Sequence, residues 1–200
     1  CQLLQAEVVN HYHSYNFLSV YQKIHNFCVT ELGGFYLDVI KDRQYTTQAD
    51  SRARRSTQTA MLQVVEMLSR MIAPILSFTA DEIWQHIPGD RVDSVFLSDF
   101  EEGHSVLGES GEFDDAFWRR ILEVKTAVNR ELEVQRAAKT VGSGLSAEVD
   151  LFCDGQLADD LARLGEELRF VLIVSRASVN SGTRAPEQAV ATEVAGLSLR

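Results

Sequence analysis

Residues 50–72 read D-S-R-A-R-R-S-T-Q-T-A-M-L-Q-V-V-E-M-L-S-R-M-I, and this stretch decides the fold. Its apolar and small residues recur every three or four positions, which is the spacing of a helix with one buried face. The residues on that face are Thr57, Ala60, Met61, Val64, Val65, Leu68 and Ile72. Asp50 and Ser51 supply a helix start signal, and Pro74 breaks or kinks the chain beyond the pattern. The stretch therefore predicts a long amphipathic helix that packs against other helices.

A helical pattern also occupies the residues upstream of this stretch. Apolar side chains repeat with helical spacing from Phe17 to Cys28, and Asn16 precedes them as a candidate N-cap. The pair Gly33-Gly34 interrupts the pattern, and it either ends the helix or lets two helices approach closely. Because an apolar face continues to Ile40, helical structure is predicted on both sides of the glycine pair.

A short helix is predicted downstream of the long one. Thr79 and Glu82 have the spacing of a capping box, which would open this helix. Trp84 lies within it and is assigned to a buried core, and Pro88-Gly89 ends it. Amphipathic helices joined by short connections predict an α-helical bundle over residues 1–100.

The second half of the sequence has a different pattern. Residues 101–113 are acidic and rich in glycine, which is typical of a linker, and residues 114–200 mix helical and strand signals. The predicted elements are a helix over 115–138, a strand over 147–153, a helix over 157–168 and short strands over 170–174 and 190–194. The predicted architecture is therefore mainly α, with a helical bundle followed by a small α+β unit.

The composition excludes several classes of protein. The 200 residues are 45% hydrophobic and 24% charged, which suffices for a buried core and is ordinary for a globular protein. No apolar run approaches the roughly 18 residues that a membrane span requires. Cysteines at positions 1, 28 and 153 match neither a disulfide framework nor a metal site, so we expect a cytoplasmic protein without membrane contacts. Because the sequence begins with Cys1 rather than Met, we also expect a longer parent chain.

Charge is distributed unevenly along the chain, whose formal net charge is −10. Residues 41–75 hold six basic and three acidic side chains, and residues 118–140 hold the same numbers, so each region carries +3. The intervening residues 76–117 hold one basic and eleven acidic side chains. A positive surface can therefore form locally on an acidic protein. The alternative is that both basic regions are solvated helix faces.

The two basic regions contain residue types that bind RNA. The first contains Lys41, Arg43, Tyr45, Arg52, Arg54 and Arg55, and the second contains Lys125, Arg130, Arg136 and Lys139. Arginine grips phosphate with a planar pair of donors, and lysine adds a point charge. Tyr36 and Tyr45 have rings on which an unpaired base can stack, although Tyr36 is equally explained by burial. Arg136 and Lys139 share a face near a helix C-terminus, where compensation of the helix dipole is the competing explanation.

Catalytic and cofactor-binding motifs are absent from the sequence. It lacks the glycine-rich phosphate loops, the G-x-S-x-G nucleophile elbow, and the H-E-x-x-H and C-x-x-C metal motifs. His11 and His13 are two residues apart and diverge on a helix, so they cannot share a metal ion. Asp81 and Glu82 are explained by helix capping. We therefore predict no catalytic residue, metal or cofactor within this chain.

Three sequence motifs in the first half of the chain, taken together, are typical of one protein family. They are F-Y-L-D-V-I-K-D-R-Q-Y at 35–45, R-R-S-T-Q-T-A-M at 54–61 and A-P-I-L-S-F-T-A-D-E-I-W at 73–84. In combination they resemble the C-terminal part of bacterial isoleucyl-tRNA synthetases, whereas the third string alone also resembles the valyl and leucyl enzymes. Shorter strings at 114–118, 128–133 and 167–172 extend the resemblance over nearly the whole chain.

This resemblance implies a class I aminoacyl-tRNA synthetase whose helical bundle binds the anticodon arm of an isoleucine tRNA. The full-length parent would be an isoleucine–tRNA ligase that uses ATP to charge the tRNA. In that family the catalytic and editing domains lie upstream, and the H-I-G-H-like and K-M-S-K-S-like catalytic motifs do not occur here. We therefore expect a non-catalytic, monomeric part of a synthetase chain. Bacterial members often end in a zinc-binding cysteine module, whose cysteines are not found before Arg200.

The resemblance also assigns tRNA contacts to both basic regions. The residues expected to bind phosphates are Lys41, Arg43, Arg52, Arg54 and Arg55, and Tyr45 is expected to meet a base or a ribose. Arg130, Arg136 and Lys139 are expected to form the second side of the grip.

Two other functions stay open at this point. The chain is alternatively the equivalent part of a valyl- or leucyl-tRNA synthetase, which a change of tRNA in a binding assay would reveal. It is alternatively a helical protein–protein adaptor without an RNA role, which would expose an apolar groove. Binding to such a partner would survive moderate salt, whereas phosphate-driven RNA binding weakens steeply as salt rises.

Overall fold

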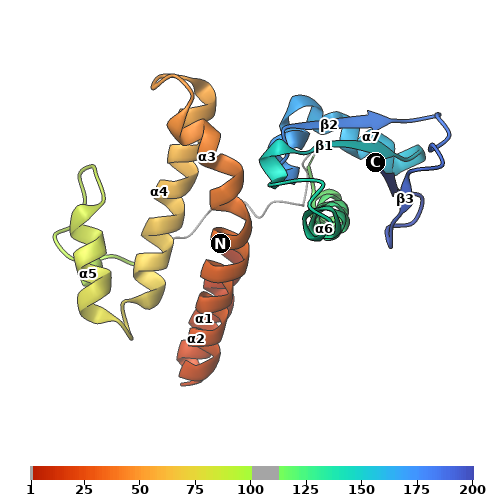
Figure 1. Cartoon of the computed structure of the whole chain (residues 1–200). Coiled ribbons are helices and arrows are strands. Elements are labelled where there is room, and N and C mark those ends of the chain that lie inside the picture. The colour runs from red at the N-terminus through yellow and green to blue at the C-terminus, as the bar shows by residue number, and fades with distance from the viewer. Residues whose placement is uncertain (1, 101–112) are drawn as a thin grey trace. The chain divides into compact units, whose positions relative to one another are not determined.

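The computed structural model describes residues 2–100 and 113–200. The chain divides into two compact units, Cys1–Val106 and Leu107–Arg200. The first is helical, and the second combines helices with a small sheet (Figure 1), so the predicted fold class is confirmed. Apart from Phe113, the predicted acidic linker lies outside the described residues. Within the described residues, no helix is both long enough and apolar enough to cross a membrane.

The first unit is a bundle whose helices pack around α4. Its elements are α1 (Gln2–His13), α2 (Phe17–Asn26), η1 (Phe27–Tyr36), α3 (Leu37–Tyr45), α4 (Arg52–Ile72), α5 (Ser77–His86) and the short 3₁₀ turn η2 (Val95–Leu97). Helix α4 contacts α1, α3 and α5. One buried cluster consists of Val8, Val20, Ile24, Met67 and Met71. A second consists of Ala73, Ala80, Trp84, Ile87 and Val95.

Helix α4 confirms the helix predicted from the opening stretch. The hydroxyl of Ser51 accepts a hydrogen bond from the backbone amide of Arg54 over 3.2 Å, which is the N-cap expected from the sequence. Met67 and Met71 are among its most buried side chains, although neither belongs to the predicted apolar face. Because α4 is covered by helices on more than one side, burial extends beyond a single stripe.

The glycine pair lies inside a helix rather than at its end. The π-helical segment η1 continues α2 into α3, and the amide of Leu37 donates to the carbonyl oxygen of Leu32, five residues earlier. A Cβ atom at Gly33 would lie 3.0 Å from the carbonyl oxygen of Cys28, and one at Gly34 would lie 3.2 Å from the next carbonyl. The wide turn therefore uses positions without side chains, and the expectation of a helix end is wrong.

Helix α5 begins earlier than predicted. It starts at Ser77, so Thr79 lies inside the first turn and the predicted capping box is wrong. The carboxylate of Asp81 instead accepts hydrogen bonds from the hydroxyl of Ser94 at 2.6 Å and from the amide of Val95 at 3.1 Å. This carboxylate therefore holds the segment after α5 against the helix.

The second unit packs helices against a small mixed sheet. Its elements are α6 (Asp115–Ala137), the 3₁₀ turn η3 (Gly144–Ser146), β1 (Glu148–Phe152), α7 (Gly155–Leu164), the 3₁₀ turn η4 (Gly165–Glu167), α8 (Leu168–Leu172), β2 (Arg176–Asn180), β3 (Val190–Ala191) and β4 (Ser198–Leu199). The strand order is β2-β1-β4-β3, with β1 parallel to β2 and the other pairs antiparallel. Leu151 lies opposite Val179 on one side and Leu199 on the other.

The unit differs from the predicted elements mainly at residues 170–180, and β4 was not predicted either. The apolar run 170–174, expected as a strand, falls on α8 and on Ile173, whose φ is +58°. A short buried apolar run suits a helix or a strand equally well by periodicity alone. The true second strand, β2, was not predicted, because residues 176–180 read R-A-S-V-N and are only partly buried. The predicted helix over 115–138 and the predicted strand over 147–153 are confirmed as α6 and β1.

Candidate nucleic-acid interface

The first basic region folds into one turn of the bundle. Helix α3 ends at Tyr45 and α4 begins at Arg52, and the two helices pack together. We refer to the six predicted residues here as the basic turn, namely Lys41, Arg43, Tyr45, Arg52, Arg54 and Arg55. The structure therefore brings together all the residues predicted for the first side of the interface.

Hydrogen bonds within the chain fix the backbone of this turn. The hydroxyl of Thr47 donates to the carbonyl oxygen of Arg43 over 2.6 Å, and the hydroxyl of Ser51 donates to Thr47 Oγ1 over 3.1 Å. Arg54 Nη1 donates to the carbonyl oxygen of Thr47 over 3.3 Å. The turn also leads into the N-terminus of α4, where the helix dipole favours negative charge. Its fixed backbone and its dipole both suit a phosphate group.

The residues that α3 contributes differ in how available they are. Lys41 is exposed and forms an ion pair with Asp38, and this hydrogen bond raises the pKa of Lys41. Arg43 is half-buried beside Tyr36, where burial raises the pKa of the Tyr36 phenol and the charge of Arg43 opposes the rise. Tyr45 is 84% exposed at the end of the helix. Tyr45 is therefore open to a base, whereas Tyr36 is largely packed.

The residues that α4 contributes also divide into two kinds. Arg52 and Arg55 are exposed in the first turn of the helix, whereas Arg54 is half-buried by its contact with the turn. Exposed arginine side chains keep their donors accessible to a phosphate. We therefore expect Arg52 and Arg55 to be phosphate ligands, while Arg54 also supports the turn.

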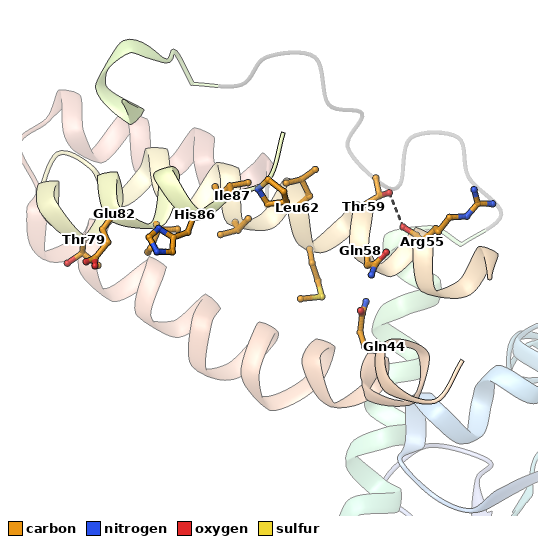
Figure 2. A pocket seen from close by; sticks show the side chains of 13 residues that line it. Gln44, Arg55, Gln58, Thr59, Leu62, Thr79, Glu82, His86 and Ile87 are labelled. Carbon is orange, nitrogen blue, oxygen red and sulfur yellow. Dashed lines mark hydrogen bonds between the residues drawn. The ribbon is translucent and has the colours of Figure 1, made fainter. Parts of the chain in front are cut away.

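A groove between α4 and α5 adjoins the basic turn (Figure 2). Its volume is about 1130 Å³. The apolar side chains that line it are Met61, Leu62, Val65, Ile83, Ile87 and Pro88. Polar side chains lie toward its two ends, with Gln44, Arg55, Gln58 and Thr59 toward one and Thr79, Glu82 and His86 toward the other. Arg55 therefore belongs to both the groove and the basic turn.

Sequence reasoning missed this groove. Only Arg55 among its lining residues was predicted to bind anything, because the groove depends on the separation of two helices rather than on a motif. The sequence held no signal for it, because Met61 was predicted on the buried face of α4 and only the structure shows that it is 38% exposed. An apolar groove was also the feature expected of a protein–protein adaptor, but here it adjoins a basic turn.

The second basic region lies on and after α6, and its arginines Arg130 and Arg136 form ion pairs. Arg130 Nη1 lies 3.3 Å from a carboxylate oxygen of Glu193. Arg136 Nη1 donates to Glu133 Oε1 over 2.6 Å, one turn earlier on the helix. Both pairs are exposed, so each contributes little stability and can exchange its partner for a phosphate.

Lys139 has an unusual backbone conformation. It follows the end of α6 with φ of +60°, a region that glycine favours. Its amide donates to the carbonyl of Arg136, and the amide of Thr140 donates to that of Gln135, both over 3.0 Å. This is the Schellman arrangement that ends a helix, with a lysine where glycine is usual. Arg136 and Lys139 line one shallow hollow, although Lys139 lies beyond the helix whose face it was expected to share.

Lys125 does not belong to a binding surface. It is 7% exposed, and its Nζ donates to the carbonyl oxygen of Val171 over 3.0 Å. Its charge is therefore held inside the second unit, and its inclusion in the second basic region was wrong. The two basic regions belong to different units, so the two-sided grip stays a prediction.

Trp84 is a core residue, as the sequence predicted. It is 2% exposed, and its indole nitrogen donates to the carbonyl oxygen of Val92 over 2.9 Å. The guanidinium carbons of Arg70 and Arg91 lie 4.8 and 5.0 Å from the ring centroid. The ring is therefore engaged on the inside of the bundle and is not a platform for a base.

The described residues offer no suitable metal centre. Among residues 2–100 and 113–200, no group of three or more His, Cys, Asp and Glu side chains could hold a metal ion. Cys28 and Cys153 lie in different units. The zinc that the resemblance associates with some parent enzymes therefore has no fitting ligand set in this part of the chain.

An exposed basic turn beside a helix N-terminus has the charge and the backbone amides that a phosphate group needs. Residues 1–151 match the family model described as the anticodon-binding domain of tRNA ligase. The match covers more than half of the chain, so the chain belongs to this family of anticodon-binding domains.

Known relatives refine the comparison. The chain is 60% identical to an isoleucine–tRNA ligase of Pseudomonas fluorescens (strain Pf0-1) and to one of Pseudomonas putida (strain W619). It is 59% identical to isoleucine–tRNA ligase 1 of Pseudomonas fluorescens. Each match spans 198 residues, which is 99% of this chain and 21% of the relative. The chain therefore corresponds to about a fifth of the length of these relatives.

Proposed function

We propose that this chain is the part of an isoleucine–tRNA ligase that binds the anticodon arm of isoleucine tRNA. The observation that carries the proposal is 60% identity to isoleucine–tRNA ligases over 99% of the chain. The family match to an anticodon-binding domain supplies the kind of ligand, and the basic turn supplies a place for it. A valyl- or leucyl-tRNA synthetase is disfavoured, because the three relatives compared are all named for isoleucine.

The basic turn holds the phosphates of the anticodon loop in this proposal. Arg52 and Arg55 are exposed, and both lie in the first turn of α4, where the helix dipole adds to their charge. Tyr45 lies at the end of α3 and is 84% exposed, so its ring can stack on an unpaired base. Lys41 is paired with Asp38, and because this ion pair is exposed, Lys41 can exchange its partner for a phosphate.

The end of the groove beside Arg55 accepts a base of the same loop. Bases that are not paired have apolar faces and polar edges, so a suitable site combines an apolar floor with amide and hydroxyl groups. Met61 and Leu62 supply such a floor, and Gln58 and Thr59 supply the polar groups. The continuity of groove and basic turn through Arg55 supports this placement.

The remaining functions of the enzyme are assigned to the rest of the polypeptide. The full-length ligase binds ATP and isoleucine outside this chain and charges the tRNA as a cytoplasmic monomer. This chain contributes no catalytic group, metal or cofactor. Its role is to position the tRNA so that the distant 3′ end reaches the catalytic domain.

Fluorescence anisotropy with labelled isoleucine tRNA at two salt concentrations tests the proposal. We expect binding that weakens steeply with salt and that an anticodon-substituted tRNA fails to compete away. Equal competition by the substituted tRNA would overturn anticodon recognition. Salt-independent capture of a protein partner, with no tRNA binding at low salt, would favour the adaptor function.

A further inference from the structure

The side chain of Gln44 is held in one orientation at the wall of the groove between α4 and α5. Gln44 lies in the last turn of α3, and its half-buried side chain projects toward Gln58 on α4 in Figure 2. Gln44 Nε2 donates a hydrogen bond to Thr57 Oγ1 over 2.5 Å. Thr57 lies on α4 and is 4% exposed, so little water reaches its hydroxyl to compete for this bond.

The hydroxyl of Thr57 decides which end of the amide faces it. A threonine hydroxyl has one hydrogen to donate and two lone pairs that accept. Thr57 Oγ1 lies 2.8 Å from the carbonyl oxygen of Arg54 and 3.2 Å from that of Ala53, and two oxygens come as close as the shorter contact only with a hydrogen between them. The hydrogen of Thr57 is therefore used inside α4, and the hydroxyl can only accept from Gln44. The amide nitrogen must face Thr57, because the amide oxygen has no hydrogen to give.

The amide oxygen of Gln44 is left as a fixed hydrogen-bond acceptor. The oxygen and the nitrogen are bonded to the same carbon and point in different directions, so Oε1 is turned away from Thr57. Among the residues that the structure describes, none donates a hydrogen bond to this oxygen. Gln44 lines the groove at the same end as Arg55, and Met61 and Leu62 are the apolar side chains nearby in the lining. A ligand in this end of the groove therefore meets an acceptor whose direction is already set.

A fixed acceptor selects a ligand group that donates. Unpaired RNA bases are read by hydrogen bonds to their Watson–Crick edges. Adenine, guanine and cytosine each carry an exocyclic amino group on this edge. Uracil has no amino group, and its ring N–H lies between two carbonyl oxygens that an amide oxygen repels. The acceptor at Gln44 therefore favours a base with an amino group over uracil.

We infer that Gln44 is a specificity-determining residue whose amide oxygen accepts a hydrogen bond from the amino group of an unpaired anticodon-loop base. Thr57 is the positioning residue, because its hydroxyl fixes the direction of that amide. This inference deepens the proposed function and rests on it, since the groove must receive a base of the anticodon loop. A site built around one hydrogen bond rejects a ligand that lacks the matching group, because its own polar atom is then left without a partner.

A double-mutant cycle between the enzyme and the tRNA tests the inference. The probes are isoleucine tRNAs in which one anticodon-loop nucleotide at a time loses its amino group. Purine riboside replaces adenosine, inosine replaces guanosine, and pyrimidin-2-one riboside replaces cytidine. At one position we expect the full-length ligase to bind the amino-free tRNA about fivefold more weakly than the intact tRNA, which is the usual contribution of one hydrogen bond. Gln44→Met is expected to bind the intact tRNA about fivefold more weakly and to bind both tRNAs equally.

Gln63→Met is the matched control for this cycle. Gln63 is also a glutamine of the bundle, but it is exposed on α4 and lies outside the lining of the groove. This variant should distinguish the two tRNAs as the unmodified enzyme does. If Gln44→Met also distinguishes them as before, the inference is overturned while the proposed function stands. Binding that is indifferent to every anticodon-loop substitution would overturn both.

Substitutions at Thr57 separate positioning from a structural role. The bond between Gln44 and Thr57 also joins α3 to α4, so its loss could lower stability alone. Thr57→Val removes the hydroxyl, and we expect it to lose the discrimination between the two tRNAs because the amide is free to turn. Thr57→Ser keeps the hydroxyl and should restore the discrimination. A Thr57→Val enzyme with a lower Tm and unchanged discrimination would show a structural bond only, and would overturn the positioning role.

Discussion

Arg54 donates a hydrogen bond to the carbonyl oxygen of Thr47 over 3.3 Å, and so ties the turn between α3 and α4 to the helix that follows it. Its neighbour Arg55 is exposed and lines the groove between α4 and α5. Two adjacent arginines therefore have different surroundings. Arg54 supports the shape of the basic turn, whereas Arg55 presents its charge to a ligand.

This difference predicts different consequences of substitution. Arg55→Ala is expected to weaken tRNA binding by about 1 kcal/mol and to reduce the salt dependence of binding by about one counterion, without changing Tm. Arg54→Ala is expected to weaken binding and also to lower Tm, because it frees the turn. Anisotropy over a salt series and thermal unfolding measure the two effects.

Arg119→Ala is the matched control for this prediction. Arg119 is also an exposed arginine on a helix, where it pairs with Asp115 at 3.1 Å. It lies in the second basic region but is not among the residues expected to bind tRNA, so its removal should leave tRNA binding nearly unchanged. Equal losses of affinity for Arg119→Ala and Arg55→Ala would show that only overall charge matters and would contradict a specific role of the basic turn.

Substitutions at Lys139 can separate the effect of its charge on tRNA binding from the effect of its backbone conformation on stability. Lys139→Gly is expected to raise the free energy of unfolding by about 0.5 kcal/mol, because glycine accepts positive φ without steric cost. The same change removes a charge and should weaken tRNA binding. Lys139→Asn, which also tolerates this conformation, is expected to weaken binding with little change in stability. Urea unfolding and anisotropy give the two readouts, and unchanged affinity in both variants would remove Lys139 from the interface.

Several elements were predictable because their sequence pattern has a single physical cause. Helix α4 and helix α6 each carry an apolar stripe at helical spacing, and the apolar residues of β1 are buried whereas Glu148 is exposed. Trp84 was assigned to the core, and it is 2% exposed. The grouping of the basic turn followed from its closeness in sequence, since a short connection between α3 and α4 brings both ends together.

Other features of the structure depend on how the elements pack together, which the sequence pattern does not show. The apolar groove exists only because α4 and α5 stand apart along part of their length. Lys125 resembled its basic neighbours, but it lies on the buried side of α6, against the carbonyl of Val171. A short apolar run such as 170–174 is compatible with either a helix or a strand. Only its packing in the folded protein determines that residues 170–172 belong to α8. The pairing of Arg130 was likewise invisible, because Glu193 is far from it in the sequence. The pair of Glu133 and Arg136 could have been predicted, because the two residues are three apart on one helix.

The glycine pair in η1 predicts an inverted substitution effect. In an ordinary helix, Gly→Ala is stabilising by about 0.5 to 1 kcal/mol. At Gly33 an added Cβ would lie 3.0 Å from the carbonyl oxygen of Cys28, which is backbone and cannot turn away. Gly33→Ala is therefore expected to destabilise the first unit by about 1 kcal/mol, the cost of a small steric overlap.

This test needs no control glycine in an ordinary helix, because the sign of the stability change caused by Gly33→Ala distinguishes the two structures. Urea unfolding of Gly33→Ala should give a lower midpoint than the unmodified chain with the same dependence on denaturant. A raised midpoint would mean that the segment is an ordinary α-helix. The wide turn described for η1 would then be incorrect.

The second unit depends on a buried carboxylate that two arginines neutralise. Asp160 on α7 is completely buried, and its carboxylate accepts hydrogen bonds from Arg120 Nε at 2.6 Å and from Gln156 Nε2 at 2.9 Å. Arg163 adds its charge at 3.5 Å. Burial by itself would raise the pKa of Asp160, but these hydrogen bonds and charges outweigh it and hold the pKa below the ordinary value.

Removal of one partner leaves a buried charge partly unpaired. Arg120→Ala is therefore expected to lower the free energy of unfolding of the second unit by about 3 kcal/mol at pH 7. This value is at the lower end of the range for a broken buried ion pair, because Gln156 and Arg163 still contact the carboxylate. Arg119→Ala, which breaks an exposed pair on the same helix, should cost less than about 1 kcal/mol. Urea unfolding followed by the fluorescence of Trp118, in a Trp84→Phe background, reports on this unit.

The same carboxylate predicts how stability varies with pH. Because the folded pKa of Asp160 lies below its ordinary value of 3.8, the unfolded chain binds this proton at a higher pH than the folded chain does. The stabilisation is therefore complete above pH 3.8 and is lost as the pH falls through the folded pKa. Asp160→Asn cannot ionise, so the stability gap between the unmodified chain and this variant should stay constant down to about pH 4 and narrow as the pH falls from there to about pH 3. A gap of constant size across that range would mean that Asp160 has the same pKa in the folded and the unfolded chain, and that its partners do not favour its ionised form.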